Sequence, residues 1–146
     1  MKKKPLPVIR NLEPQRSELN TLLEFYQNKR YEDAEKLALI LTGKFQTHPF
    51  GWKVLGAILN QTGRLSEGLI ACQKSVELAP ENAEAHYNLG VTLKELGRLE
   101  ESEESCKKAV ELAPENSTAH YNLGNTLYML KKLEKAEESY RKAIEH

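Results

Sequence analysis

The chain has 146 residues, enough for about one domain, and its 21 Lys and Arg residues balance its 21 Asp and Glu residues. A net charge of zero disfavours a nucleic-acid partner, which requires a basic face. No stretch approaches the roughly 18 apolar residues of a membrane span, so we expect no membrane partner. The N-terminus also lacks the apolar core of a secretory signal, and we therefore expect a cytoplasmic protein.

The start of the chain, 1–14, is expected to form a flexible tail, because Pro5 and Pro7 follow a run of lysines. Beyond the tail, apolar residues recur at i, i+3, i+4 and i+7, which is typical of amphipathic helices. Gly97 and Pro114 stand where a helix would end, and Asn82 and Asn116 stand where the next would begin. The pattern predicts helices at 17–28, 31–45, 49–62, 65–78, 83–96, 99–112, 117–130 and 133–145.

The sequence repeats itself at a constant interval. AHYNLG occurs at 85–90 and again at 119–124, and VELAPEN occurs at 76–82 and again at 110–116. An interval of this size holds one pair of helices, which cannot bury its apolar stripe alone, but stacked pairs can bury a continuous core. We expect four units, at about 15–48 (degenerate), 49–82, 83–116 and 117–146.

These residues resemble the tetratricopeptide repeat, most clearly through a Leu-Gly pair near the middle of the first helix in the last three units; the degenerate unit lacks this Gly. The matching residues are Trp52, Leu55, Gly56 and Leu59 in one unit and Leu123, Gly124, Leu127, Ala136, Tyr140 and Ala143 in the last. The resemblance implies an all-α fold, an α-solenoid of about four helix-turn-helix units in a right-handed superhelix. Gly68 and Ser102 replace the usual Ala, and Cys72 and Cys106 replace the usual aromatic residue, so we expect a slightly looser middle core.

Catalytic, metal and cofactor sites are not expected. Cys72 and Cys106 are separated by one full repeat, without the close spacing of a metal or redox pair, and are expected to be reduced and buried. One repeat spacing, on the order of 10 Å, exceeds the roughly 7 Å limit for a disulfide. His86 and His120 occupy the position of Trp52, which favours packing over catalysis.

The first helices of the units carry Tyr and Asn on the face opposite their apolar stripe, where a merely solvated face would carry Lys and Glu. The resemblance places this face in a concave groove. Tyr offers flat apolar area, and Asn offers a donor and an acceptor to a peptide backbone. The alternative is that both are consensus residues of the repeat, kept for packing. The candidate peptide-binding residues are Lys53, Tyr87, Asn88, Lys94, Tyr121, Asn122, Asn125 and Tyr128.

The expected partner is a protein or an extended peptide. A carboxylate clamp for a chaperone tail is disfavoured, because Ala57, Thr118 and Asn122 stand where that clamp needs Asn, Lys and Arg. The Asn88–Asn122 ladder is more similar to the repeat domain of O-linked N-acetylglucosamine transferases. The resemblance is to the N-terminal repeat array of bacterial proteins of this kind, and because the chain stops inside a helix we expect a longer natural protein.

A second hypothesis is a purely structural scaffold. Helix 133–145 is expected to leave apolar residues uncovered, and uncovered apolar surface tends to find a partner. The chain would then form a homo-oligomer through its C-terminal repeat. The residues concerned are Leu133, Ala136, Tyr140 and Ile144.

Overall fold

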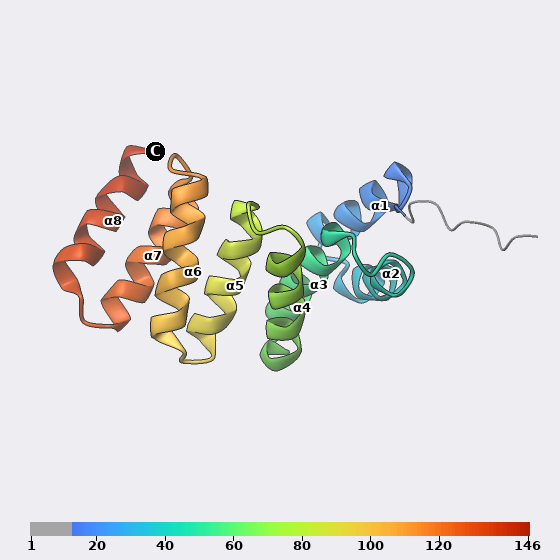
Figure 1. Cartoon of the computed structure of the whole chain (residues 1–146), viewed down its shortest axis with the longest axis horizontal. Helices are drawn as coiled ribbons and strands as arrows, with labels where there is room; N and C mark the ends of the chain where they lie inside the picture. The colour runs from blue at the N-terminus through green and yellow to red at the C-terminus, as the bar shows by residue number, and fades with distance from the viewer. Residues whose placement is uncertain (1–12) are drawn as a thin grey trace, which may run out of the picture.

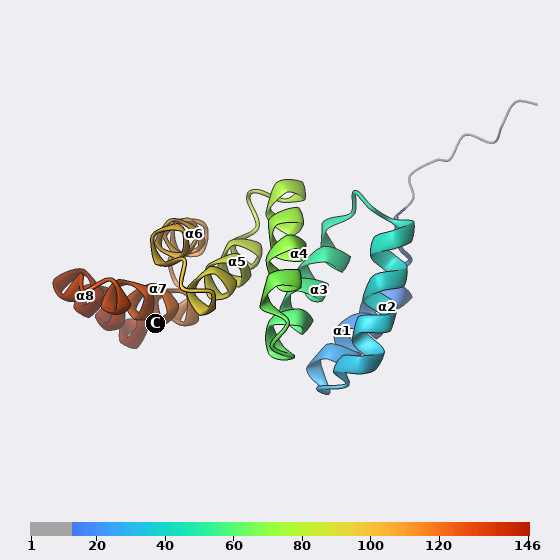
Figure 2. The ribbon, with the colours of Figure 1, turned by 90° about the horizontal axis from the view of Figure 1, so that it is seen from below.

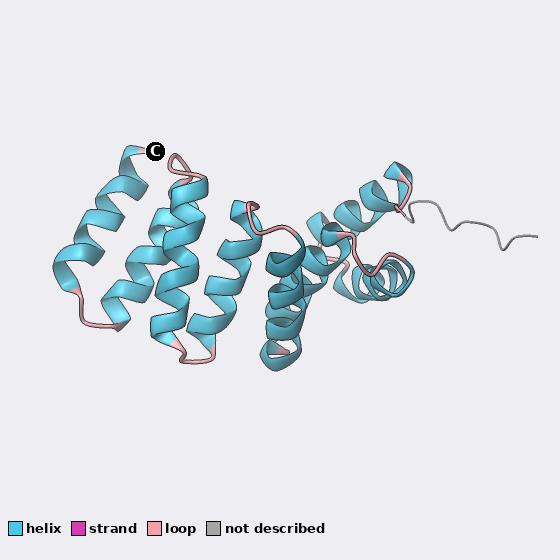
Figure 3. Cartoon of the chain, in the orientation of Figure 1, coloured by secondary structure: helices cyan, strands magenta, loops and turns pink. Residues whose placement is uncertain are grey.

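The computed structural model describes residues 13–146, and the predicted tail, residues 1–14, lies almost wholly outside them. All regular structure in the described part is helical (Figures 1 and 3). The eight predicted helices are confirmed, and each end differs from its prediction by at most one residue. The helices are α1 (Arg16–Gln27), α2 (Tyr31–Lys44), α3 (Pro49–Gln61), α4 (Leu65–Leu78), α5 (Ala83–Glu95), α6 (Leu99–Leu112), α7 (Ser117–Met129) and α8 (Leu133–Glu145).

The helices form a single row in chain order, which confirms the predicted α-solenoid (Figure 1). Each helix packs on the next one along the chain, and α1, α3, α5 and α7 also contact one another in succession. Among the described residues the even-numbered helices make no such contacts with each other. The odd-numbered helices therefore form the inner layer of the array. The helix directions also turn along the row, since α2 and α4 stand upright in Figure 2 whereas α7 and α8 lie across it.

Asparagine and proline define the starts of the inner helices. The side chains of Asn82 and Asn116 accept hydrogen bonds from the backbone N–H of Ala85 and Ala119, at 3.0 and 3.1 Å. These bonds satisfy amide groups that the first turn of a helix leaves unpaired. α3 begins instead with Pro49, whose fixed φ suits the first helical position. The predicted N-caps are thus confirmed.

The turns inside the helix pairs share one backbone conformation. Gly63 and Gly97 have φ of 78° and 79°, and Lys29 and Lys131, at the same repeat position, have φ of 60° and 65°. A left-handed residue closes the C-terminus of a helix, and glycine adopts it without the steric penalty that Cβ causes. The first and last pairs therefore carry lysine in a conformation that favours glycine.

Glycine also lets the two helices of a pair approach closely. A Cβ atom on Gly56 would lie 2.6 Å from Cys72 Sγ, and one on Gly90 would lie 2.7 Å from Cys106 Sγ. In the last pair, a Cβ on Gly124 would lie 2.7 Å from the ring of Tyr140. The glycine of the Leu-Gly pair thus makes room for the facing side chain of the second helix.

The expected packing roles of the cysteines and histidines are confirmed. Cys72 and Cys106 are free and buried. His86 and His120 are buried, and the Nε2 atom of each lies 2.7 Å from the carbonyl oxygen of Pro80 or Pro114. Each histidine therefore ties an inner helix to the loop that precedes it.

The apolar core is concentrated in the N-terminal half. One large buried cluster connects α1 to α4, and a much smaller one connects α6, α7 and α8. The large cluster consists of Leu22, Ala34, Ala38, Leu41, Val54, Leu55, Ile58, Leu59 and Ala71. The small one consists of Cys106, Leu123, Leu127 and Ala136, with Val110 and Tyr140 packed against it.

Candidate peptide-binding groove

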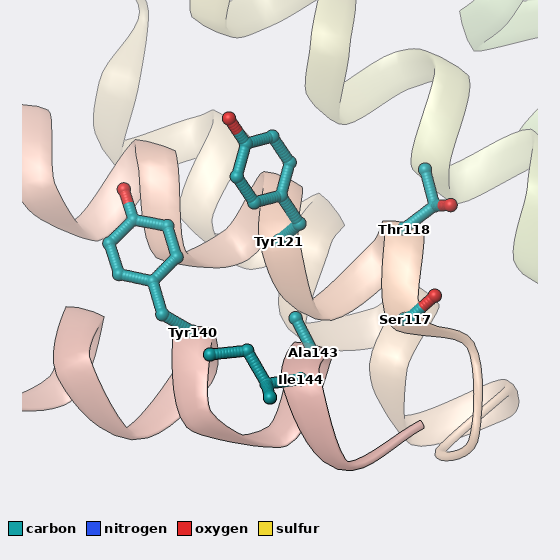
Figure 4. A pocket seen from close by; sticks show the side chains of 6 residues that line it. All are labelled: Ser117, Thr118, Tyr121, Tyr140, Ala143 and Ile144. Carbon is teal, nitrogen blue, oxygen red and sulfur yellow. The ribbon is translucent and has the colours of Figure 1, made fainter.

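Three hollows lie along the inner layer of the array. The first, of about 240 Å³, is lined by Leu23, Tyr26, Phe50, Lys53, Val54, Ala57 and Glu84. The second, of about 290 Å³, is lined by Ala83, Glu84, Tyr87, Asn116, Thr118 and Ala119. The third, of about 430 Å³, is lined by Ser117, Thr118, Tyr121, Tyr140, Ala143 and Ile144 (Figure 4). Consecutive hollows share Glu84 or Thr118, so they form a continuous track along the odd-numbered helices.

The first hollow has apolar walls and an ion pair at its edge. Lys53 Nζ lies 3.1 Å from Glu84 Oε2 and 5.5 Å from the centre of the Phe50 ring. The side chain of Lys53 is only 16% exposed, whereas that of Glu84 is 66% exposed. The positive charge of Lys53 is therefore neutralised within the groove, which weakens any attraction for acidic ligands.

Tyr87 and Asn88 are both half-buried on α5. Tyr87 lines the second hollow, and burial raises the pKa of its hydroxyl, so this group stays protonated at neutral pH. The Nδ2 atom of Asn88 is buried and has no hydrogen-bond partner among the described residues. An unsatisfied buried amide is costly, and Asn88 thus has a free donor.

Asn122 lies in a different environment from Asn88, although the two share a repeat position. It is 4% exposed; its Nδ2 donates to Cys106 Sγ at 3.1 Å, and its Oδ1 accepts from Lys94 Nζ at 2.9 Å. Both ends of the amide are therefore engaged inside the protein. Binding of a ligand by Asn122 or Lys94 stays a prediction, and it would require this bond between them to break.

A buried polar network surrounds Asn122, and the sequence reasoning missed it. Ser102 Oγ donates to the carbonyl oxygen of Gly90 at 2.7 Å and lies 3.2 Å from Thr126 Oγ1. Thr126 in turn donates to the carbonyl oxygen of Asn122 at 3.1 Å. The available signal was the recurrence of Thr92 and Thr126 on the core-facing side of two successive inner helices.

The thiol of Cys106 takes part in the same network. Burial raises the pKa of Cys106, and hydrogen bonding with Ser102, Thr126 and Asn122, together with the charge of Lys94, opposes that rise. The net direction is upward, so the sulfur is a neutral thiol at physiological pH. A buried, protonated thiol is a poor nucleophile, which fits a packing role.

The remaining candidates lie on α7. Tyr121 and Tyr128 are 57% and 58% exposed, and are available to a partner. Asn125 is half-buried, and its Oδ1 accepts a hydrogen bond from the Tyr140 hydroxyl at 2.7 Å. The rings of Tyr121 and Tyr140 are tilted at 50° with centroids 5.9 Å apart, and Figure 4 shows them rising from neighbouring helices beside the third hollow. The structure thus brings these tyrosines together and ties Asn125 to one of them.

Two further features bear on function. Within residues 13–146, no three His, Cys, Asp or Glu side chains are grouped closely enough to hold a metal ion. No helix in that range is long and apolar enough to cross a membrane.

Comparison with known proteins gives a family match for part of the chain and a structural likeness for most of it. Residues 81–146 match a tetratricopeptide repeat model. No curated protein matches the chain at a significant level. Among solved structures, "MamA 41-end from Desulfovibrio magneticus RS-1" superposes with a TM-score of 0.78 at 24% identity, covering 88% of this chain and 72% of that one.

A second structure, "Crystal structure of MamA", gives a TM-score of 0.77 at 20% identity, covering 87% of this chain and 77% of that one. At these identities the likeness shows the fold alone. The structural likeness covers nearly the whole chain, whereas the match to the repeat model covers only its C-terminal part. This is consistent with the constant interval of the sequence repeat. The family match therefore covers residues 81–146, and the structural likeness shows that the described remainder of the chain has the same fold.

Proposed function

We propose that the array binds an extended segment of a partner protein along the three hollows of the inner layer. The observation that carries the proposal is the exposure of Tyr121, which lines the third hollow, and of Tyr128, which lies seven residues further along α7 and so on the same side of that helix. Large aromatic side chains with polar tips are enriched where proteins bind one another. The proposed site of action is the cytoplasm.

The contacts available to such a ligand are few and mostly unspecific. Tyr121 and Tyr128 provide exposed apolar area, whereas Asn88 Nδ2 is buried and reaches a peptide carbonyl only if the side chains around it move. One hydrogen bond contributes only about 0.5–1.5 kcal/mol net. We therefore expect micromolar or weaker affinity and broad specificity, as in the transferase repeat domains that the Asn ladder resembles.

The test begins with a partner captured on the immobilised array and identified by mass spectrometry. Its affinity is then measured for the wild type and for the Tyr121→Ala/Tyr128→Ala variant. These side chains are exposed, so folding should be unaffected and binding should weaken at least tenfold. Leu39→Ala is a matched control, because Leu39 is 54% exposed on α2 and lines none of the three hollows. Unchanged binding in the tyrosine variant would rule the groove out.

The asparagines need a separate comparison. Asn88→Ala removes a donor that has no partner within residues 13–146, so a loss of binding would implicate this amide directly. Asn122→Ala also removes the bonds to Cys106 and Lys94, and its effect on binding is informative only if the free energy of unfolding is measured alongside.

A second candidate function is that of a self-associating scaffold. The expectation that α8 leaves Ala136 uncovered is wrong, because Ala136 is 2% exposed and packs with Leu123 and Leu127 of α7. Leu133 and Ile144 are 56% and 86% exposed, which supports the prediction that the C-terminal repeat takes part in oligomerisation. Sedimentation at several concentrations tests this candidate. A strict monomer at high concentration would rule it out.

A further inference from the structure

A fourth hollow lies on the side of the even-numbered helices, away from the groove. It has a volume of about 230 Å³ and lies over α3, between α2 and α4. Figure 2 shows α3 between these two helices, which do not contact each other in the described part of the chain. We call it the outer hollow. None of its lining residues lines the three hollows of the inner layer.

The outer hollow is lined mainly by apolar side chains. Leu55 and Leu59 of α3 are buried at its base, and Trp52 of the same helix is half-buried beside them. Leu39 of α2 and Ile70 of α4 stand at its two sides and are 54% and 66% exposed. Exposed apolar side chains that gather around one hollow indicate a binding site.

The other units lack this apolar set. In the order of Leu39, Trp52 and Ile70, the equivalent residues are Gln73, His86 and Glu104 one repeat further along and Lys107, His120 and Glu138 two repeats further along. The apolar lining is therefore not a general feature of the repeat. The hollow is bounded by α2, α3 and α4 themselves, so its exposure does not depend on where the array ends.

One edge of the outer hollow carries a net negative charge. The guanidinium of Arg64 pairs with both Glu35 and Glu67, and the described lining includes no other basic residue. Two carboxylates thus share one positive charge. A ligand with apolar side chains followed by a basic one therefore complements the hollow better than an acidic ligand does.

The chain itself contains a segment of this chemistry, directly before the described part. Residues 5–12 have the sequence PLPVIRNL, which contains one basic residue and no acidic one. The prolines disfavour a helix there, and in an extended backbone alternate side chains point to the same side. Leu6, Val8 and Arg10 then form one row, with two apolar residues followed by a base.

This segment is long enough to reach the outer hollow. The described chain begins beside the C-terminal end of α2 in both views (Figures 1 and 2). Neighbouring helices pack about 8–10 Å apart. Leu39 precedes the last residue of α2, Lys44, by about 7–8 Å at the rise of an α-helix. An extended chain covers about 17 Å between Val8 and Glu13, which suffices for both steps.

We propose that the outer hollow binds residues 5–12 of the same chain. Leu6 and Val8 fill its apolar part, and Arg10 lies beside the two carboxylates that share Arg64. A docked segment thus takes the place of the flexible tail expected for residues 1–14. This segment covers the apolar side chains that stand where the other units expose polar or charged ones.

The test uses full-length variants, with Trp52, the only tryptophan of the chain, as the probe. Leu6→Asp combined with Val8→Asp should empty the hollow, so acrylamide should quench Trp52 at least twice as strongly as in the wild type. Both substitutions precede the described helices, and circular dichroism should be unchanged. A labelled peptide of residues 1–12 should bind this double variant at least tenfold more tightly than the wild type, whose hollow is already filled. Arg10→Gln in the peptide should weaken binding several-fold.

A substitution in the hollow itself locates the bound peptide. Leu39→Asp, added to the double variant, should abolish peptide binding. The matched control is Ile40→Asp, because Ile40 is 50% exposed on the same helix but does not line the hollow, and it should leave binding unchanged.

Three results would overturn the proposal. If Trp52 is quenched equally in the wild type and the double variant, the hollow is open and is left to another protein. If the peptide still binds after Leu39→Asp, it lies elsewhere. If the shielding of Trp52 in the wild type is lost on dilution, the segment comes from a second copy of the chain. None of these results involves Tyr121 or Tyr128, so a failure here is distinguishable from a failure of the groove.

Discussion

The α2/α3 and α6/α7 interfaces occupy equivalent positions in the array but are held together by different chemistry. At the first, Val54 and Ile58 of α3 are buried among Ala38, Leu41 and other apolar side chains. At the second, the residues in those two positions are Asn122 and Thr126, which hydrogen-bond to Ser102 and Cys106 of α6. The helices nevertheless begin and end in register, two repeats apart.

The middle interface, between α4 and α5, shows the transition between the two. Thr92 of α5 lies 3.5 Å from Cys72 Sγ of α4 and donates to Asn60 Oδ1 of α3 at 2.9 Å. Ser75 Oγ and Asn88 Nδ2, however, are buried without partners among the described residues. The geometry of the repeat therefore tolerates apolar, mixed and polar contacts at the same positions. The left-handed turn inside each helix pair recurs through the array, at Lys29, Gly63, Gly97 and Lys131, and helps to fix the arrangement of the helices.

The largest loss of stability is expected when the α2/α3 interface is given the residues of the α6/α7 interface. Val54→Asn with Ile58→Thr would bury an amide and a hydroxyl among alanine and leucine side chains, which offer no partner. An unsatisfied buried polar group costs about 1–3 kcal/mol, and the lost apolar contacts add to this, so we expect a total loss of about 3–5 kcal/mol. Urea denaturation followed by circular dichroism measures the change.

The reciprocal exchange is the control. Asn122→Val with Thr126→Ile removes the polar groups of α7 while Ser102 keeps its bond to the Gly90 carbonyl. Lys94 is half-buried and can turn to water, so the change should stay within about 1 kcal/mol. A loss as large as that of the first exchange would mean that the polar network is required for the fold.

The next effect concerns the glycines that face the second helix of each pair. Gly90→Ala would place Cβ 2.7 Å from Cys106 Sγ and 3.5 Å from its backbone nitrogen, and neither atom can move far in the middle of the array. Overpacking of this kind costs about 1–3 kcal/mol. For Gly124→Ala, the three atoms nearest to the added Cβ all belong to the ring of Tyr140, which is half-buried in the last pair and can swing outward, so we expect a smaller loss. Equal losses in thermal melts would contradict this difference between the middle and the end.

The sequence predicted the positions of the helices far better than the contacts of the polar side chains between them. Leu-Gly pairs, the loop prolines and the capping asparagines act locally, so their phasing alone located all eight helices to within one residue. The roles of Asn88 and Asn122 depend on contacts between helices far apart in the sequence. Their identical repeat position suggested parallel exposure to a groove, but Cys106 and Lys94 engage Asn122 while Asn88 Nδ2 finds no partner in the described part of the chain.

From the sequence, we interpreted the replacement of aromatic residues by Cys72 and Cys106 only as a loss of side-chain volume in the core. This interpretation did not anticipate that Cys106 would join Ser102 and Thr126 in a hydrogen-bonded network. Polar residues at core positions have many possible partners, and only the three-dimensional arrangement selects among them.

A smaller effect is expected at the turns of the two outermost pairs. Lys131→Gly should stabilise the protein by about 1 kcal/mol, because Lys131 has φ of 65° and Cβ is disfavoured there. Lys29→Gly should do the same at the N-terminal end. The matched control is Gly97→Ala in the middle of the array, which should destabilise by a similar amount. If Lys131→Gly lowers the melting temperature, the left-handed turn is not strained by lysine.

The smallest loss of stability is expected from removing the charge of Glu103, which lies at the α6/α7 interface. Glu103 is buried at the polar interface, with its carboxylate 2.7 Å from Lys107 Nζ and 2.6 Å from Lys132 Nζ. Burial favours a higher pKa for Glu103, but the hydrogen bonds and charges of the two lysines outweigh it and hold the pKa below its usual 4.5. A carboxylate with a lowered pKa stabilises the folded state above the unfolded pKa, and this contribution is lost as the pH falls through the folded pKa.

Glu103→Gln should therefore lower stability by about 0.5 kcal/mol at pH 7 and flatten the decline of stability below about pH 4.5. The control is Glu67→Gln, because hydrogen bonding to Arg64 lowers the pKa of Glu67 as well, but that ion pair is exposed and screened by salt. Urea denaturation of the three proteins at pH 7, 5, 4 and 3, in low and high salt, provides the comparison. If Glu103→Gln loses stability below about pH 4.5 as steeply as the wild type does, the ion pairs of Glu103 with the two lysines do not stabilise the protein. The polar interface would then be held together by its hydrogen bonds alone.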